Sequence, residues 1–209
     1  MKYKTVVFDL DGTLIDTLGD LTASVNAVLS RFSFSSMSTF DVRLRIGNGL
    51  RKLMERCLPQ GTENAVIEEA MSVFKAHYAE NLLVHARPYD GMAALLARLK
   101  SHGVRLAVAT NKDEPLARTL IDCFFPDVFD AVCGMLPGRT PKPAPDIPEA
   151  AVGKDKCILF IGDSETDYDT AIQNGYAFLG VAWGYGKTLA ESAVWAKDMC
   201  ELEGLIFKE

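Results

Sequence analysis

The stretch TVVFDLDGT at residues 5–13 decides the fold. It begins with four β-prone residues, Thr5–Phe8, which predict a short buried strand. It runs on directly into two aspartates, Asp9 and Asp11, with Gly12 and Thr13 after them. Similar apolar runs at residues 104–109, 131–133, 158–161 and 177–182 alternate with stretches of helical spacing. We therefore predict an α/β fold with a doubly wound, Rossmann-like parallel sheet as its core.

The helical stretches are predicted from apolar residues at 3.6-residue spacing. We expect helices over residues 92–102, 115–123, 167–174 and 188–199, and a helical stub near residues 148–152. Gly103 and Gly175 stand just past two of them, where a helix commonly ends on glycine.

One long segment breaks the alternation of strands and helices. From about residue 17 to residue 83 we find no strand pattern and three successive sets of helical spacing. We therefore expect an inserted all-helical cap domain over residues 16–85. The Rossmann-like catalytic core would then consist of residues 1–15 and 86–209.

Composition excludes several classes of protein. The 209 residues carry 22 basic and 28 acidic side chains, and the resulting net charge of -6 disfavours a nucleic-acid-binding surface. No apolar run approaches the roughly 20 residues of a membrane span, and the first residues do not resemble a signal peptide. The five cysteines show no paired spacing, which is typical of reduced thiols in a cytoplasmic protein. Composition does not distinguish a monomer from a dimer.

Polar residues follow three of the predicted strands. Asp9 and Asp11 follow the first, Thr110–Asn111 the second, and Asp163 and Asp167 follow the strand at residues 158–161. Ligands of doubly wound sheets bind outside the carboxyl ends of the strands. We therefore expect these side chains to meet in one crevice, although about 150 residues separate the first from the last.

The four aspartates predict a metal site. Carboxylates that lie close together raise one another's pKa or recruit a cation. Oxygen ligands without a histidine or cysteine cluster favour a hard ion, most simply Mg²⁺. A single aspartate after a strand can equally be a helix N-cap, so the prediction depends on Asp9, Asp11, Asp163 and Asp167 occurring together.

Four motifs together resemble the haloacid dehalogenase-like hydrolases. DLDGTLIDT at residues 9–17 resembles the first motif of that family, Thr110–Asn111 the second, Lys142–Pro143 with Pro145 the third, and GDSETD at residues 162–167 the fourth. The helical insertion resembles the subclass with a helical cap. IGNG at residues 46–49 and PYDGM at residues 88–92 are similar to segments of phosphoglycolate phosphatases, although Asp90 stands where proline is expected.

The resemblance implies a Mg²⁺-dependent phosphatase that hydrolyses a small phosphorylated metabolite through an aspartyl-phosphate. It gives Asp9 as the nucleophile, and a carboxylate needs no base because it is already ionised at neutral pH. Asp11 would be the general acid and then the base. Asp9 and Asp163 would bind the metal by their side chains, Asp11 by its carbonyl, and Asp167 through water or from outside the coordination shell.

Further residues are expected to hold the phosphate and the rest of the substrate. Gly12 would let the backbone approach, Thr110 and Asn111 would cradle the phosphate, and Lys142 would neutralise charge on the transferring phosphoryl group. In the cap, the turn Gly47, Asn48 and Gly49, with Arg43, Arg45 or Arg51 near it, would contact the anionic substrate. A plain turn and solvated arginines are the simpler interpretation of that segment.

Other functions stay open at this point. The favoured substrate is 2-phosphoglycolate, and the alternatives are a sugar phosphomutase, a pyrophosphatase, or a receiver-like module that signals through a phosphorylated aspartate. The segment GYGKT at residues 184–188 suggests a nucleotide-binding P-loop, but Val181 stands where the first glycine of that motif is required. We interpret it as a glycine-rich turn that lines the crevice.

Overall fold

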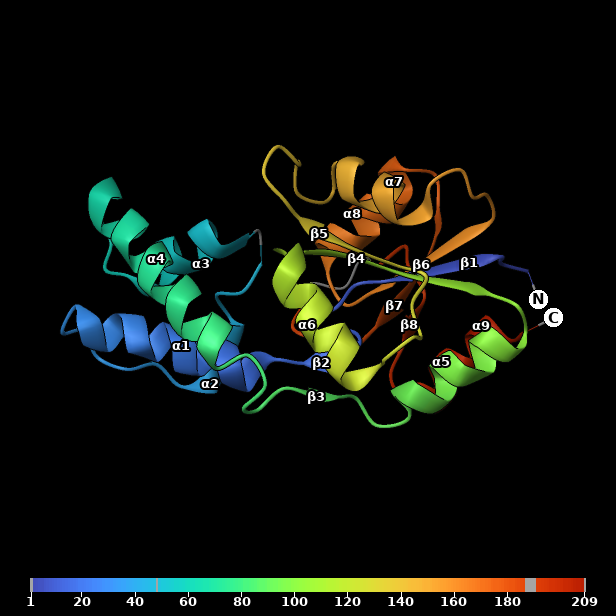
Figure 1. The fold of residues 1–209 in the computed structure, drawn as a ribbon, viewed down its shortest axis with the longest axis horizontal. Helices are drawn as coiled ribbons and strands as arrows, with labels where there is room; N and C mark the ends of the chain where they lie inside the picture. Colours follow the sequence, from blue (N-terminus) through green and yellow to red (C-terminus); the bar gives the residue numbers. More distant parts are fainter. Residues whose placement is uncertain (1, 48, 187–190, 209) are drawn as a thin grey trace. The chain divides into compact units, whose positions relative to one another are not determined.

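The computed structural model describes residues 2–47, 49–186 and 191–208 (Figure 1). The chain forms two compact units, one made of Met1–Asp16 with Pro88–Glu209, and the other of Thr17–Arg87. The first unit is therefore built from two separate parts of the sequence.

A six-stranded sheet forms the centre of the first unit. Its strands are β1 (Thr5–Phe8), β4 (Arg105–Asp113), β5 (Ala131–Met135), β6 (Ile158–Gly162), β7 (Ala177–Val181) and β8 (Trp195–Ala196). They lie in the order β5-β4-β1-β6-β7-β8, and every pairing between neighbours is parallel. This arrangement confirms the predicted α/β fold with a Rossmann-like sheet.

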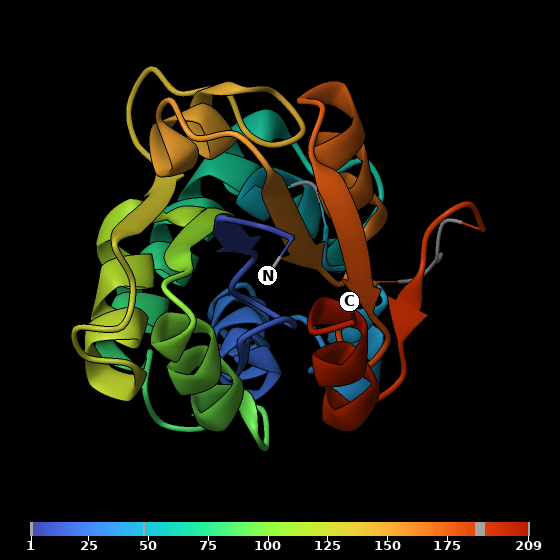
Figure 2. The same cartoon turned by 90° about the vertical axis from the view of Figure 1, so that its right-hand side faces the viewer.

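Helices cover both faces of this sheet (Figures 1 and 2). On one side lie α5 (Met92–Ser101), α6 (Glu114–Phe124) and α9 (Met199–Ile206), and on the other α7 (Asp146–Val152) and α8 (Glu165–Gln173). The side with α7 and α8 buries a cluster that includes Val7, Phe160, Ile147 and Ala171. Because both faces are covered, β1 is a continuous buried run and not an alternating one.

Strand β1 lies at the point where the winding of the sheet reverses. It pairs over its whole length with β4 on one side and β6 on the other, so that Phe8 is level with Val108 and with Ile161. Residues that follow these three strands therefore leave the sheet at the same edge. In open α/β sheets this edge is where ligands bind.

The second unit contains α1 (Leu18–Arg31), α2 (Thr39–Arg43), α3 (Gly49–Cys57) and α4 (Asn64–Glu80). Helix α1 packs against α4 through buried side chains such as Val25, Leu29 and Phe74. None of the helices in the described part of the chain has the length and apolar character needed to cross a membrane.

The two ends of the second unit are joined by a buried carboxylate. Asp20, in the first turn of α1, is fully buried and accepts hydrogen bonds from the backbone N–H groups of His85 (2.8 Å) and Ala86 (2.9 Å). Gly19 lies so close to His85 that an added Cβ would approach the His85 Cβ to 2.6 Å. Nearby, β2 (Ile15–Asp16) and β3 (Arg87–Pro88) pair in a separate two-stranded sheet.

The helix predicted over residues 188–199 is wrong in the part that the structure describes. Trp195 and Ala196 form β8, which pairs with Gly180 and Val181 of β7, and α9 begins only at Met199. Asp198 caps α9 by accepting a hydrogen bond from the N–H of Glu201. The apolar residues that gave the helical spacing belong to an edge strand, and pairing with β7 overrides the local pattern. Residues 187–190 lie outside the described residues.

The Glu114 carboxylate ties the start of α6 to the segment after β5. It accepts hydrogen bonds from Arg118, from Arg139 and from the N–H of Gly134. Burial on its own would raise the pKa of Glu114, but these donors outweigh burial and hold the pKa below its ordinary value. The ionised carboxylate is therefore the form that stabilises the fold.

We expect the Glu114→Gln variant to lose about 1–3 kcal/mol of unfolding free energy at pH 7, because the charged acceptor is removed while its donors stay. A carboxylate with a lowered pKa stabilises the fold above its unfolded-state pKa and loses that effect as the pH falls through the folded-state pKa. The difference between wild type and variant should therefore shrink below about pH 4.5.

Urea unfolding of the first unit at several pH values measures this difference. Asp122→Asn serves as the control, because Asp122 is an exposed acidic residue of the same helix. A gap between Glu114→Gln and wild type that is constant from pH 7 to the acid limit would contradict the assignment.

Candidate active site

Three aspartates meet at the edge where β1 and β6 end. Asp9 directly follows β1, Asp163 follows β6, and Asp167 lies in the first turn of α8. All three are buried, and one carboxylate oxygen from each lies within 4.8 Å of the others. The structure thus brings together residues that are more than 150 positions apart.

The ammonium group of Lys142 lies among these carboxylates. Its Nζ donates to Asp9 Oδ1 (2.8 Å), to Asp167 Oδ1 (2.7 Å) and to the carbonyl oxygen of Ala109 (2.8 Å). Burial would lower the pKa of Lys142, but the negative charges of Asp167 and Asp9 outweigh it and raise the pKa above the ordinary value. Lys142 is therefore charged, and its three donors have three acceptors.

Asn111 holds the backbone on which Lys142 is carried. Its Oδ1 accepts from the N–H of Lys142 (2.7 Å), and its Nδ2 donates to the carbonyl of Lys142 (3.2 Å). Both ends of the carboxamide are thus in contact with the residue that presents the ammonium. We expected the Asn111 side chain to bind phosphate. In the structure it holds the backbone of Lys142, a contact that the sequence did not indicate.

Thr110 is buried beside this clamp, in the part of β4 that lies beyond its pairing with β1. Its Oγ1 accepts a hydrogen bond from the N–H of Lys112 (3.3 Å). Within the described part of the chain the hydroxyl accepts this bond and donates none, which leaves its proton available to an anion at the crevice.

Asp163 is oriented by donors from two distant segments. Thr13 donates its hydroxyl proton to Oδ1 (3.0 Å), and the N–H groups of Tyr185 (2.6 Å) and Gly186 (3.2 Å) donate to Oδ2. At Gly184 an added Cβ would lie 2.3 Å from the Asp163 Cβ, so only glycine lets the segment approach this closely.

Gly12 approaches Asp163 from the other side. Its φ is +88°, a left-handed conformation that favours glycine, and a Cβ there would lie 2.7 Å from Asp163 Oδ2. The glycine that we expected to allow a close backbone approach therefore does so against a carboxylate of the site.

The Asp11 carboxylate lies apart from this three-aspartate cluster. Its two oxygens accept from Lys112 Nζ at 3.0 and 3.1 Å, and the Lys112 side chain is only 5% exposed. Sequence analysis missed Lys112, and the signal that could have found it is its position immediately after Thr110–Asn111. The ion pair keeps the Asp11 side chain at the edge of the site.

The charges of the site are unbalanced. Among the residues that the structure describes at this site, the ammonium groups of Lys112 and Lys142 face four carboxylates, those of Asp9, Asp11, Asp163 and Asp167. Burial, opposed by Lys142 and reinforced by Asp167, raises the pKa of Asp9 to about 7. Burial and the charges of Asp167 and Asp9 raise the pKa of Asp163 to about 8. A divalent cation with a preference for oxygen ligands fits this excess of buried negative charge.

The substrate-binding residues expected from the helical insertion lie in the second unit. Arg43 is the last residue of α2, Gly47 lies in the segment before α3, and Gly49 is the first residue of α3; both glycines have positive φ angles. Arg56 donates to the carbonyl of Gly47 (2.9 Å). Asn48 lies outside the described residues.

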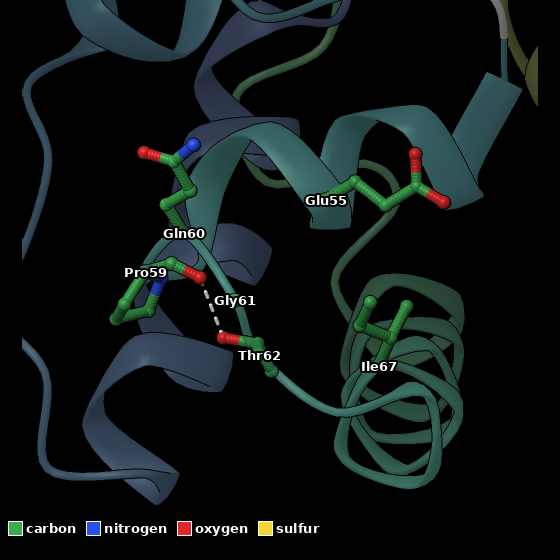
Figure 3. A pocket seen from close by; sticks show the side chains of 6 residues that line it. All are labelled: Glu55, Pro59, Gln60, Gly61, Thr62 and Ile67. Atoms are coloured by element: carbon green, nitrogen blue, oxygen red, sulfur yellow. Dashed lines mark hydrogen bonds between the residues drawn. The ribbon is translucent and has the colours of Figure 1, made fainter.

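A pocket between α3 and α4 is also in the second unit (Figure 3). It is lined by Glu55, Pro59, Gln60, Gly61, Thr62 and Ile67. Its one charged side chain, Glu55, is already paired with Lys52 and Arg51, and the Thr62 hydroxyl donates to Pro59 (Figure 3). None of these six lining residues is cationic, so the pocket does not suit a phosphate ester.

Comparison with known proteins decides the family. The model of the haloacid dehalogenase-like hydrolases matches residues 6–181, which contain all four motifs. The chain belongs to the haloacid dehalogenase-like hydrolase family.

Within this family, the haloacid dehalogenase-like hydrolase described here is similar to several phosphoglycolate phosphatases. It is 36% identical to a phosphoglycolate phosphatase of Cereibacter sphaeroides, over 86% of this chain and 85% of the relative, and 31% identical to a phosphoglycolate phosphatase of Aquifex aeolicus, over 88% and 87%. A crystal structure of a provisionally assigned phosphoglycolate phosphatase from Lactobacillus delbrueckii subsp. bulgaricus superposes with a TM-score of 0.93 at 28% identity, covering all of both chains. The chain is a hydrolase of phosphoric monoesters.

We expect Asn111→Ala to lower kcat for p-nitrophenyl phosphate by about 10–100-fold, because loss of two hydrogen bonds releases the backbone that positions Lys142. Steady-state hydrolysis measures it, and circular dichroism checks the fold. Asn26→Ala is a matched control, because Asn26 clamps the backbone of Met37 in the second unit by the same pair of hydrogen bonds. Equal kcat values for Asn111→Ala and wild type would show that the clamp does not position Lys142.

Proposed function

We propose that this hydrolase cleaves a small phosphate monoester, with 2-phosphoglycolate as the favoured substrate, through an aspartyl-phosphate on Asp9. One observation carries the proposal: the Asp9 carboxylate is buried beside a charged lysine, in a site with an excess of negative charge. The names of the relatives support the choice of substrate.

Asp9 is suited to nucleophilic attack because its two oxygens differ. Oδ1 accepts from Lys142, whereas Oδ2 accepts no hydrogen bond from the described residues and has solvent access. In the first step a bond forms between Oδ2 and phosphorus, and the bond between phosphorus and the bridging oxygen breaks. Lys142 fixes the carboxylate for this attack and adds positive charge where the transferring group is most negative.

The donor set of the site supports Mg²⁺ as the cofactor. Asp9 and Asp163 would hold the ion by their side chains and Asp11 by its carbonyl, while Asp167, already bonded to Lys142 and Ser164, would act from outside the coordination shell. When bound, the ion supplies the positive charge that lets an anionic nucleophile meet a phosphate dianion. Thr110 adds a hydroxyl donor for a phosphoryl oxygen.

Asp11 moves the protons of the reaction. In the first step Asp11 acts in its protonated form, which the second step regenerates, and gives this proton to the bridging oxygen, which leaves as the alcohol. In the second step it takes a proton from a water molecule whose oxygen attacks the phosphorus of the aspartyl-phosphate. The acyl phosphate bond breaks, inorganic phosphate is released, and Asp9 is regenerated. General acid–base help of this kind contributes about 10²–10⁴-fold to a rate.

We expect Asp9→Asn to lower kcat by at least about 10⁴-fold, because an amide is not a nucleophile toward phosphorus. Phosphate release is measured on a panel of 2-phosphoglycolate, sugar phosphates, pyrophosphate and p-nitrophenyl phosphate, with Mg²⁺ and with EDTA. Asp122→Asn should behave like wild type under both conditions.

Three outcomes of this assay would replace the proposal. Activity that survives both EDTA and Asp9→Asn would overturn the mechanism. Isomerised sugar phosphate without free phosphate would indicate a phosphomutase, and a slowly decaying phosphoprotein without turnover would indicate a receiver-like module.

We expect Asp11→Asn to accumulate phosphorylated enzyme from p-nitrophenyl phosphate. That leaving group needs little protonation, so the first step continues, while hydrolysis of the intermediate lacks its base. Acid-quenched mass spectrometry should show one added phosphoryl group on the peptide that contains Asp9, and none in the Asp9→Asn/Asp11→Asn double variant. Unmodified enzyme throughout turnover would argue against this role of Asp11.

A further inference from the structure

Lys112 is a buried cation next to the proposed general acid. It lies near the carboxyl end of β4, and its Nζ is about equally distant from the two Asp11 oxygens, at 3.0 and 3.1 Å. The Asp11 side chain is 21% exposed, against 5% for Lys112. The ammonium is thus held in place by the protein, while the carboxylate in front of it still meets solvent.

Lys142, the other ammonium of the site, is fully occupied. Its three contacts are with Asp9, Asp167 and the Ala109 carbonyl, all on the nucleophile's side of the site. In the ion pairs of the site, Lys112 contacts Asp11, whereas Lys142 contacts Asp9 and Asp167. A second anionic group of a substrate that lies beside Asp11 is therefore close to the ammonium group of Lys112.

The distance between the bridging oxygen and Lys112 Nζ determines which anionic group of a substrate Lys112 can bind. A general acid lies within roughly 3 Å of the oxygen that it protonates, and Lys112 Nζ lies one hydrogen bond beyond Asp11. In the phosphate ester of an α-hydroxy acid, a carboxylate is attached to the carbon that bears the bridging oxygen. That carboxylate comes within hydrogen-bonding distance of Nζ when the bridging oxygen contacts Asp11.

We propose that Lys112 binds the carboxylate of the leaving group and thereby selects phosphate monoesters of α-hydroxy acids. The inference rests on the proposed function, because it needs Asp11 at the bridging oxygen. The inference assigns substrate selectivity to a residue of the sheet. The sequence analysis had instead assigned it to the arginines of the helical insertion.

Two of those arginines are committed elsewhere in the second unit. Arg51 pairs with Glu55 and Glu68, and Arg45 donates to the carbonyl oxygens of Asp41 and Arg56. Their guanidinium groups hold α2, α3 and α4 to one another. The experiment therefore compares substitutions of Lys112 with a substitution of Arg43, the third arginine that the sequence analysis named.

The experiment compares 2-phosphoglycolate with phosphoglycolamide, in which a neutral amide replaces the carboxylate at nearly the same size. For wild type we expect kcat/KM to be about 10–100-fold higher for the carboxylate, as for one charge-assisted hydrogen bond. Lys112→Gln should reduce this ratio to near one, and Lys112→Arg should restore part of it. Taking the ratio within each variant cancels any general loss of activity that follows from disturbing Asp11.

Two control variants locate the effect. Lys100→Gln removes a lysine that bonds only the carbonyl oxygens of Asp127 and Val128 on the first unit, and it should keep the wild-type ratio. Arg43→Gln should keep it as well. A ratio that falls in Arg43→Gln and not in Lys112→Gln would overturn the inference in favour of the second unit.

Binding without turnover separates this inference from the proposed function. Isothermal titration of Asp9→Asn with the two ligands should show the same preference, lost in Asp9→Asn/Lys112→Gln. Equal affinity of Asp9→Asn for both ligands would overturn the inference even if wild type hydrolyses 2-phosphoglycolate through Asp9. If wild type hydrolyses neither ester, the proposed substrate is wrong, and a preference for the carboxylate that Asp9→Asn shows and Asp9→Asn/Lys112→Gln lacks still assigns carboxylate binding to Lys112.

Discussion

The buried ion pair between Lys142 and the carboxylates of Asp9 and Asp167 is the interaction on which the site depends. Removing one partner of a buried pair typically costs about 3–5 kcal/mol, because the other charge stays behind without compensation. Here one ammonium group joins Asp9, which follows β1, to Asp167 in the first turn of α8, and its third hydrogen bond is to Ala109 of β4. The same contact that holds these elements together also fixes the position of Asp9 Oδ1, an oxygen of the proposed nucleophile.

The backbone pairing of the sheet makes this contact possible, because it places the ends of three strands close together. Because β1 is paired on both sides with parallel strands in matched register, the first residues beyond β1, β4 and β6 are placed at one edge without flexible linkers. The loop that carries Lys142 has no such support from the sheet. Asn111 supplies it by bonding both backbone groups of Lys142, and this links the loop after β5 to the end of β4.

The sequence was sufficient for β1, β4, β5, β6 and β7 and for the meeting of Asp9 and Asp163, because apolar runs and strand-end aspartates are local signals. It was insufficient where a contact joins distant segments. The Asn111 clamp on Lys142 and the Tyr185 and Gly186 donors to Asp163 depend on loop paths that no spacing rule encodes. The error at residues 188–199 has the same origin, because Trp195 and Ala196 are strand only by virtue of β7. Lys112 was overlooked since a lysine at a strand end is usually solvated, and only its pairing with Asp11 distinguishes it.

The Asp20 carboxylate has a consequence for how such a fold can diversify. By binding the amides of His85 and Ala86 beside the first turn of α1, it brings the entry and exit of a 71-residue segment, residues 17–87, to the same spot. A segment whose ends already meet adds little loop-closure entropy to the chain that hosts it, whatever its length. The whole helical segment can therefore be replaced as one unit, in evolution or by protein engineering, while the sheet and its catalytic edge stay unaltered.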